Sequence, residues 1–489
     1  MKRATLVLAV AALSCAALLA GRAGRLQPAP KLAAPVARVA LDDTALAARL
    51  ADALRLPTVS YAEAERIDPE PFRRFHALLR AQFPQLHRTL DVEAIGAFGL
   101  LYRWAGSDRT CRPALLAAHM DVVPVEPGTE RRWTHPPFAG AIADGYVWGR
   151  GALDDKSNLI AQLEAVEWLL TQGFRPACTV YFAYGHDEEV GGADGAARIA
   201  ATLRARGARL AWTLDEGSAI TRGIIAGVDA PVAAIMAGEK GYATFRLTAQ
   251  GSGGHASTPG PDNAILRLAR ALSRLAERPM PARLLPPVAG MLDRLAPHMP
   301  VAERVLIANR DLFEPLLLRA LSATPITDAL IRSTQAVTVV RAGVKDNVLP
   351  SEAQALVNVR LLPGDRIADA REHLRRAIDD PAIAVEIAAG TGFANEAPPL
   401  SDPQSPEFTL IERTVNEIFP QALVTSGIIL ATTDNRHYAD LRDQAWYFSP
   451  YPYTPDDQPR VHGTDERIGI EAYADMVRFY IRLLQNTGA

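Results

Sequence analysis

Short apolar strands alternate with helical segments along the first half of this chain, and this alternation restricts the fold strongly. The expected strands are the apolar runs at 114–118, 179–184 and 210–214. The helical pattern occupies 42–54, 71–82, 158–172 and 192–206. Strands and helices in this order are typical of a mainly parallel sheet with helices on its faces. The sequence therefore predicts an α/β domain from about residue 41 to 240.

Residues 241–390 follow a different order. They read as a strand (242–250), a helix (263–276), two strands (336–341 and 353–361), a helix (367–378) and a strand (384–387). This β-α-β-β-α-β order describes a ferredoxin-like α+β domain. Residues 281–331 form a Leu- and Arg-rich insertion that reads as extra helices. Alternation returns over 391–489, so the simplest organisation is a small domain inserted into a discontinuous α/β domain.

The first 25 residues have the pattern of a targeting segment. Lys2 and Arg3 precede an apolar run at 4–20, and small and basic residues at 21–25 end it. This describes an export signal, and the run nearly reaches the ~20 residues that span a bilayer. Residues 1–25 are thus expected to be a signal peptide or a membrane anchor, with the protein exported or membrane-anchored on the extracytoplasmic or periplasmic side. The proline-containing stretch 26–40 then forms a linker.

Charge and cysteine content exclude other classes. With 52 basic and 55 acidic residues, the net charge of −3 gives no reason to expect a nucleic-acid partner. Three cysteines are too few for a disulfide scaffold or a cysteine-zinc module. Cys111 and Cys178 each lie just before a predicted strand. Two free buried thiols are expected there, with one bridge in an oxidising compartment as the alternative.

Acids and histidines gather in segments that follow predicted strands or lie in loops. The segments are LLAAHMDVVPV with His119 and Asp121, WGRGALDDKSN with Asp154, VYFAYGHDEEVGG with Glu188 and Glu189, WTLDEGS with Asp215 and Glu216, and RVHGTDER with His462. The carboxyl ends of parallel strands share one edge of a sheet, where ligands and chemistry collect. We therefore expect these side chains to meet.

Such a cluster predicts a metal site. Buried acids repel one another and resist desolvation unless cations neutralise them. Imidazole nitrogen and carboxylate oxygen bind borderline divalent metals, and two metals ~3.5–4 Å apart can share a carboxylate. A single His-x-Asp, or a single acidic pair, is more often a surface pair or a helix cap. It is the joint occurrence at one sheet edge that predicts a dinuclear site.

From about residue 45 to the C-terminus, the sequence resembles a family of dinuclear-zinc hydrolases. That family includes aminoacylase-1, acetylornithine deacetylase, glutamate carboxypeptidase and carboxypeptidase S. The motifs GHDEEVGG, LDEGSAI, TDNRHY and VHGTDERI are most similar to the carboxypeptidase S and N-fatty-acyl-amino-acid hydrolase branch. The resemblance implies a zinc-peptidase catalytic domain and an inserted lid or dimerisation domain. It implies hydrolysis of an amide bond adjacent to a free carboxylate, in a small peptide or an N-acyl amino acid.

The same resemblance assigns the metal ligands. Asp154 is expected to bridge two Zn²⁺ ions, with His119 and Asp215 completing one site and Glu189 and His462 the other. Glu216 competes with Asp215, because adjacent residues of a strand point to opposite faces and only one should reach the site. Co²⁺ or Mn²⁺ would accept the same ligands.

The resemblance also assigns catalytic roles. Glu188 would be the general base that takes a proton from a metal-activated water. Asp121 would orient the ring of His119. His255, in GSGGHASTPG, would stabilise the tetrahedral oxyanion, either from the partner subunit of a homodimer or after closure of the domain.

Two further residues would bind substrate. Arg436 matches an arginine that grips the substrate carboxylate, since a guanidinium can bond both oxygens of the anion at once. Asn347, in VKDNVLP, matches a residue of the lid near the substrate.

The alternative functions are a dipeptidase of the same family and a non-catalytic metal-binding member of it. The presence of Glu188, His255 and Arg436 argues against loss of catalysis.

Overall fold

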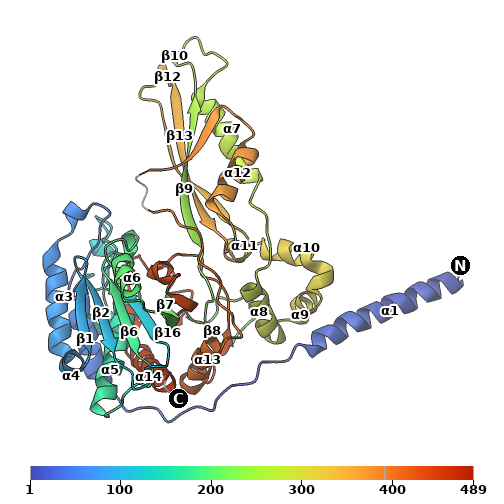
Figure 1. The fold of residues 1–489 in the computed structure, drawn as a ribbon. Helices are drawn as coiled ribbons and strands as arrows, with labels where there is room; N and C mark the ends of the chain where they lie inside the picture. The colour runs from blue at the N-terminus through green and yellow to red at the C-terminus, as the bar shows by residue number, and fades with distance from the viewer. Residues whose placement is uncertain (1, 390–392, 488–489) are drawn as a thin grey trace.

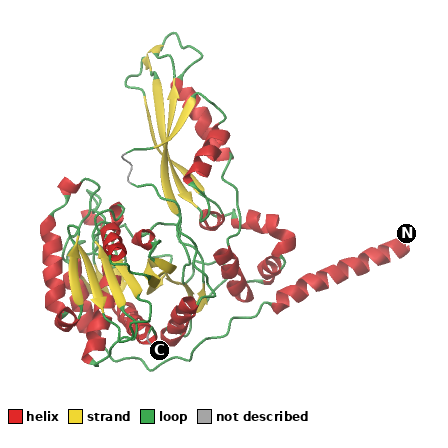
Figure 2. Cartoon of the chain, in the orientation of Figure 1, coloured by secondary structure: helices red, strands yellow, loops and turns green. Residues whose placement is uncertain are grey.

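The computed structural model describes residues 2–389 and 393–487, and its main body is built on a large mixed sheet (Figures 1 and 2). The strand order is β1-β2-β6-β3-β7-β8-β15, with β16 beside β7. The strands are β1 (Asp91–Ile95), β2 (Gly99–Trp104), β3 (Ala114–His119), β6 (Val180–Gly185), β7 (Leu210–Thr221), β8 (Val232–Ala234), β15 (Leu423–Thr425) and β16 (Arg442–Tyr453). The pairs β3–β6, β3–β7, β7–β16 and β8–β15 are parallel, so the predicted parallel core is confirmed. The antiparallel strands β1 and β2 were missed by the sequence analysis.

Helices bury both faces of this sheet, which is why its central strands are continuous apolar runs. Along β3, Leu116 and Ala118 join one hydrophobic core, whereas Leu115 and Ala117 join another on the opposite face. The first core is covered by α2 (Asp43–Leu54), α3 (Pro69–Gln82), α4 (Pro84–Thr89), α5 (Lys156–Thr171), α13 (Pro406–Ile418) and α14 (Ile470–Asn486). The second lies under α6 (Ala196–Ala205). A small sheet of β4 (Ala141–Ala143), β5 (Tyr146–Trp148) and β17 (Arg467–Gly469) lies beside them.

The second domain projects from the main body in Figure 1. Its antiparallel sheet has the order β11-β13-β9-β14. The elements follow the chain as β9 (Gly241–Gln250), α7 (Ala264–Glu277), β11 (Thr334–Ala342), β13 (Glu352–Leu361), α12 (Ile367–Ile378) and β14 (Ile383–Ile387). This is the ferredoxin-like order that the sequence predicts. A two-stranded ribbon of β10 (Gly254–His255) and β12 (Val348–Leu349) forms the tip of the domain (Figure 1).

The insertion is helical and packs against the main body. It contains α8 (Pro286–Leu295), α9 (Val301–Ala308), α10 (Arg310–Leu321) and α11 (Pro325–Ile331). Leu295 packs with Val228 and Val232 beside β8, and Val288 packs with Ile428. Helix α1 (Lys2–Arg25) leads into an irregular stretch at 26–42. None of the helices in the described ranges combines the length and hydropathy that a membrane crossing needs.

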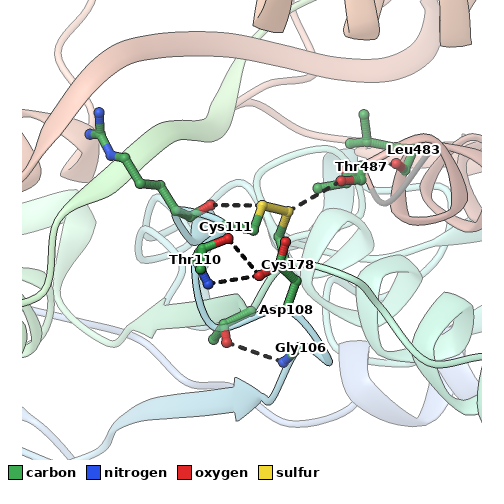
Figure 3. The surroundings of a disulfide bond; sticks show 9 residues. Gly106, Asp108, Thr110, Cys111, Cys178, Leu483 and Thr487 are labelled. Atoms are coloured by element: carbon green, nitrogen blue, oxygen red, sulfur yellow. Dashed lines mark hydrogen bonds between the residues drawn. A yellow bond between two sulfur atoms is a disulfide. The ribbon is translucent and has the colours of Figure 1, made fainter.

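Cys111 and Cys178 form a disulfide, so the expectation of two free thiols was wrong (Figure 3). Cys111 precedes β3 and Cys178 precedes β6, and these strands are parallel neighbours that begin side by side. This brings the two Cα atoms to 5.1 Å, within the range that a disulfide requires. Strand neighbourhood is a tertiary property, which the positions of the cysteines in the sequence could not supply.

Candidate dinuclear metal centre

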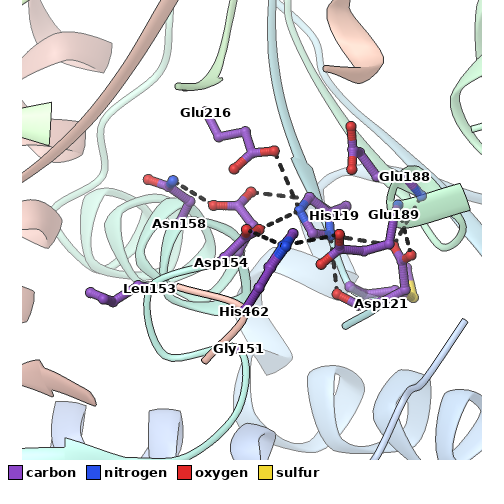
Figure 4. A network of polar contacts seen from close by, with 12 residues as sticks. His119, Asp121, Gly151, Leu153, Asp154, Asn158, Glu188, Glu189, Glu216 and His462 are labelled. Carbon is purple, nitrogen blue, oxygen red and sulfur yellow. Dashed lines mark hydrogen bonds and ion pairs between the residues drawn. The ribbon is translucent and has the colours of Figure 1, made fainter. Parts of the chain in front are cut away.

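The acidic and histidine segments meet at one edge of the large sheet. His119 ends β3 opposite Gly185, the last residue of β6, and the acidic run that follows β6 therefore lies beside His119. Asp154 lies just before the first turn of α5, and His462 lies in the loop that leads to β17. Figure 4 shows these side chains pointing toward one another. The sheet edge predicted from the sequence is thus where the cluster lies.

Two groups of potential ligands share the carboxylate of Asp154. In the first, Nε2 of His119 lies 3.0 Å from Oδ1 of Asp154 and 3.4 Å from Oε1 of Glu216. In the second, Nε2 of His462 lies 3.0 Å from Oδ2 of Asp154 and 3.2 Å from Oε2 of Glu189. Each oxygen of Asp154 faces a different histidine. A carboxylate placed in this way can bridge two ions.

The structure places Glu216, and not Asp215, in the first group. Asp215 is buried on the other side of β7, the side from which Thr213 Oγ1 donates to Asn435 Oδ1 at 2.6 Å. The preference for Asp215 as the ligand therefore does not fit the geometry, and the alternative Glu216 does. The reason is the alternation of side chains along a strand, which sends only one of these neighbours toward His119.

Asp121 holds the parts of the cluster together. Its carboxylate accepts hydrogen bonds from Ser60 Oγ (2.6 Å) and from the backbone N–H groups of Glu188 and Glu189 (3.2 Å each). Nδ1 of His119 lies 3.0 Å from the carbonyl oxygen of Asp121 and 3.3 Å from its Oδ1. These contacts direct Nε2 of His119 toward Asp154 and Glu216. Ser60 was missed by the sequence analysis, since an isolated serine far from the motifs gives no signal.

The electrostatics of the cluster follow from burial and close packing of charge. The pKa of His462 is raised to about 10, because hydrogen bonds to Asp154 and Glu189 favour the protonated ring. Burial and the charge of Asp154 raise the pKa of Glu216 to about 7. Burial also raises the pKa of Glu188 well above its usual range, and nearby carboxylates raise it further. A raised pKa makes the carboxylate of Glu188 a stronger proton acceptor than an ordinary glutamate.

The donor set fits divalent metal ions. Each group offers one imidazole nitrogen and two carboxylates, which are ligands of borderline metals. Oε1 of Glu189 is buried without a hydrogen-bond partner in the described part of the chain. A buried carboxylate oxygen left in this state is costly unless a cation neutralises it. Glu188 belongs to neither group of potential ligands, which is compatible with the general-base role expected from the sequence.

Arg436 lies beside the loop that carries Glu188 and Glu189. Its Nη2 donates to the carbonyl oxygen of Gly191 at 2.7 Å, and its Nη1 donates to the carbonyl oxygen of Thr433. The guanidinium carbon lies 4.3 Å from the ring centroid of Phe393. The cation is therefore fixed within the neighbourhood of the cluster by two backbone acceptors and an aromatic ring.

His255 and Asn347 are not brought to the cluster within this chain. Both lie at the tip of the second domain, because His255 ends β10 and Asn347 directly precedes β12, the two strands labelled there in Figure 1. The backbone N–H of Ala256 donates to the carbonyl oxygen of Asn347 at 3.1 Å. His255 is exposed, and its Nδ1 lies 2.7 Å from Ser257 Oγ. Their expected roles in catalysis require the tip to reach a cluster, by closure of the domain or from a second copy of the chain.

Fold and site together define a dinuclear metallohydrolase with an inserted α+β domain. The family model Peptidase family M20/M25/M40 matches residues 115–486. The chain belongs to this family of metal-dependent peptidases and amidohydrolases.

Curated relatives of similar length agree with this assignment. A probable carboxypeptidase S-like 2 from Dictyostelium discoideum is 40% identical over 453 residues, which cover 91% of this chain and 86% of the relative. An N-fatty-acyl-amino acid synthase/hydrolase PM20D1 from Xenopus tropicalis is 36% identical, covering 90% of this chain and 85% of the relative. The M20 family metallo-carboxypeptidase Sso-CP2 from Sulfolobus solfataricus has the same fold, with a TM-score of 0.66, 18% identity and coverage of 92% and 100% of the two chains.

Proposed function

We propose that this enzyme hydrolyses amide bonds whose nitrogen belongs to an amino acid with a free carboxylate. The observation that carries the proposal is the position of Arg436, which is anchored to Gly191 two residues after Glu189. An arginine there can bond both oxygens of a carboxylate while the adjacent amide lies over the cluster. The names of the two relatives, carboxypeptidase S-like 2 and N-fatty-acyl-amino acid synthase/hydrolase, describe substrates of this kind.

The residues divide the work of hydrolysis. Divalent ions held by the two groups would lower the pKa of a water molecule and polarise the amide carbonyl. Glu188 takes the proton from the attacking water and delivers it to the leaving nitrogen. Asp121 keeps His119 oriented, and Arg436 holds the substrate carboxylate. His255 donates to the developing oxyanion when the tip of the second domain reaches a cluster.

A substrate panel tests the proposal. N-acetyl amino acids, N-fatty-acyl amino acids, N-blocked dipeptides and free dipeptides are compared with analogues whose C-terminal carboxylate is amidated. We expect turnover of the N-acylated, free-carboxylate compounds and a large loss upon amidation. Equal turnover of the amidated analogues would contradict it, and a preference for free dipeptides would favour the dipeptidase alternative.

We propose that the two ions are Zn²⁺, since zinc prefers imidazole and carboxylate ligands at low coordination number. Metal analysis of the purified protein is expected to give about two ions per chain, as in the dinuclear sites of this class. Chelation should abolish turnover, and Zn²⁺ should restore it. Restoration by Co²⁺ or Mn²⁺ but not by Zn²⁺ would change the assigned metal without changing the mechanism.

The exposed position of His255 at the tip of the second domain supports a proposal about the oligomeric state of the enzyme. If His255 acts in the cluster of a second copy, a mixture of His255→Ala and Glu188→Ala proteins will recover activity, because a mixed dimer contains one intact site. Recovery that is absent in a verified mixed dimer would favour closure of the domain within one chain.

Export is the proposed location. The basic and apolar N-terminal segment and the Cys111–Cys178 disulfide both support it, because structural disulfides persist in oxidising compartments. Fractionation of cells that express the full chain tests this, and an N-terminal sequence of the mature protein shows whether residues 1–25 are removed.

A further inference from the structure

The carboxylate of Glu466 is completely buried, and both of its oxygens accept hydrogen bonds from residues 150–154, the loop that carries Asp154. Its Oε2 accepts from Arg150 Nη1 at 2.7 Å and from the backbone N–H of Gly151 at 3.0 Å. Its Oε1 accepts from the backbone N–H groups of Leu153 at 2.8 Å and Asp154 at 3.1 Å. Both oxygens thus have two donors each, and three of the four donors belong to the backbone of one short loop.

Glu466 itself belongs to the segment RVHGTDER, which also contains His462. His462 and Asp465 have φ values of +58° and +60°, a region that residues other than glycine seldom occupy. Such a backbone persists only where the surroundings hold it. Arg150 supplies one such contact, since its Nη2 donates to the carbonyl oxygen of Gly463 at 2.9 Å while its Nη1 binds Glu466.

We propose that Glu466 is a positioning residue that sets the metal affinity of both groups by joining the Asp154 loop to the His462 segment. Glu466 is a member of neither metal group, but its Oε1 accepts from the backbone N–H of Asp154, whose carboxylate is common to both. Glu466 also follows His462, the histidine of the second group, by four positions in the sequence. The separation of Asp154 and His462 therefore depends on a third residue, and misplacement of a ligand weakens metal binding.

The substitution Glu466→Gln tests this with almost no change in shape. A glutamine side chain replaces one oxygen by NH₂, which cannot accept a hydrogen bond from the donors it faces. In one orientation of the amide these are the N–H groups of Leu153 and Asp154, and in the other the N–H of Gly151 and Nη1 of Arg150. We expect the affinity for divalent metal to fall about 10–100-fold at both groups, the range seen when residues behind a ligand are changed. At saturating metal, kcat should recover to near the wild-type value, since the side chain of Glu466 is completely buried behind the Asp154 loop.

Glu417 provides a matched control for general destabilisation. It is also a buried carboxylate, and it accepts from Arg482 at 2.6 and 2.8 Å, Asn486 at 2.9 Å and Arg413 at 3.2 Å, between α13 and α14. Glu417→Gln should lower the unfolding temperature without changing metal affinity. If Glu466→Gln fails to fold, Arg150→Met removes one donor and leaves the three backbone contacts, and a smaller loss of affinity is expected.

Metal titration monitored by calorimetry measures these affinities independently of turnover. The inference about Glu466 rests on the metal groups of the proposed function, and different results would contradict the inference and the proposed function. A wild-type protein that binds no divalent metal would remove the proposed function. A wild type that binds two ions, with a folded Glu466→Gln that binds them equally tightly, would overturn only the role of Glu466. An equal loss of affinity in Glu417→Gln would overturn it too.

Discussion

Glu216 Oε1 lies 3.4 Å from Nε2 of His119, whereas Asp215, the adjacent residue on β7, lies on the opposite face of the strand, from which Thr213 donates to Asn435. One strand thus supplies the metal group from one face and supports the Arg436 segment from the other. The sequence does not show which of the two acids is the ligand, whereas the fold places them on opposite faces of β7.

Substitution of these neighbours should separate their roles. Glu216→Gln is expected to weaken binding of the ion at the His119 group by one to two orders of magnitude, because it removes an anionic ligand. Asp215→Asn should leave metal stoichiometry unchanged. Calorimetric titration of both variants measures this, and a larger loss in Asp215→Asn would restore Asp215 as the ligand.

Glu188→Gln should remove proton transfer and keep the metals. General acid–base catalysis contributes about 10²–10⁴-fold, so kcat is expected to fall within that range. Metal analysis of the same preparation should match the wild type, because Glu188 lies outside both groups. A variant that retains wild-type kcat would show that another group accepts the proton.

Arg436→Ala should act on substrate recognition. A charged hydrogen-bonded contact contributes about 1.5–3 kcal/mol, which corresponds to a rise in KM of about 10–150-fold for carboxylate substrates. Steady-state kinetics with acid and amidated forms of one substrate measure the effect. The variant should discriminate less between the two forms, and an unchanged ratio would mean that Arg436 does not bind the carboxylate.

Glu417 gives a pH-dependent contribution to stability. Although burial opposes it, hydrogen bonds from Arg482, Asn486 and Arg413 lower its pKa from 4.5 to about 2 in the folded protein. Because the folded value is the lower one, this stabilisation is present above pH 4.5 and is lost as the pH falls toward 2.

Comparison with Glu417→Gln isolates that contribution. The variant should be less stable near pH 7, by at most about 3 kcal/mol, and the difference should shrink steadily below the unfolded pKa of the carboxyl group. Denaturant unfolding of both proteins at several pH values provides the measurement. A difference independent of pH would mean that packing rather than charge accounts for the loss.

The Cys111–Cys178 bridge should stabilise the main body. It closes a loop with a sequence separation of 67 residues, for which chain entropy predicts about 4 kcal/mol. Replacement of both cysteines by serine should lower the free energy of unfolding by up to this amount and leave metal binding intact. Thermal unfolding with and without reductant gives the comparison, and no change in the midpoint would show that the bridge does not form in solution.

The sequence by itself determined the kind of fold and the chemistry of the site. Apolar runs buried on both sides, such as 114–118, predict central strands because both faces must be apolar. Acids directly after such strands predict a shared sheet edge, and His119, Asp154, Glu189 and His462 do meet there. Both conclusions depend on local pattern and on a general rule of parallel sheets.

Only the tertiary structure decided which side chains face each other. The orientation of Glu216 rather than Asp215, the pairing of Cys111 with Cys178 and the contact between Glu466 and the Asp154 loop all depend on strand register and loop path. These contacts join residues that are distant in sequence or differ by one position on a strand. Composition and spacing do not predict such geometry, because it depends on the packing of the whole domain.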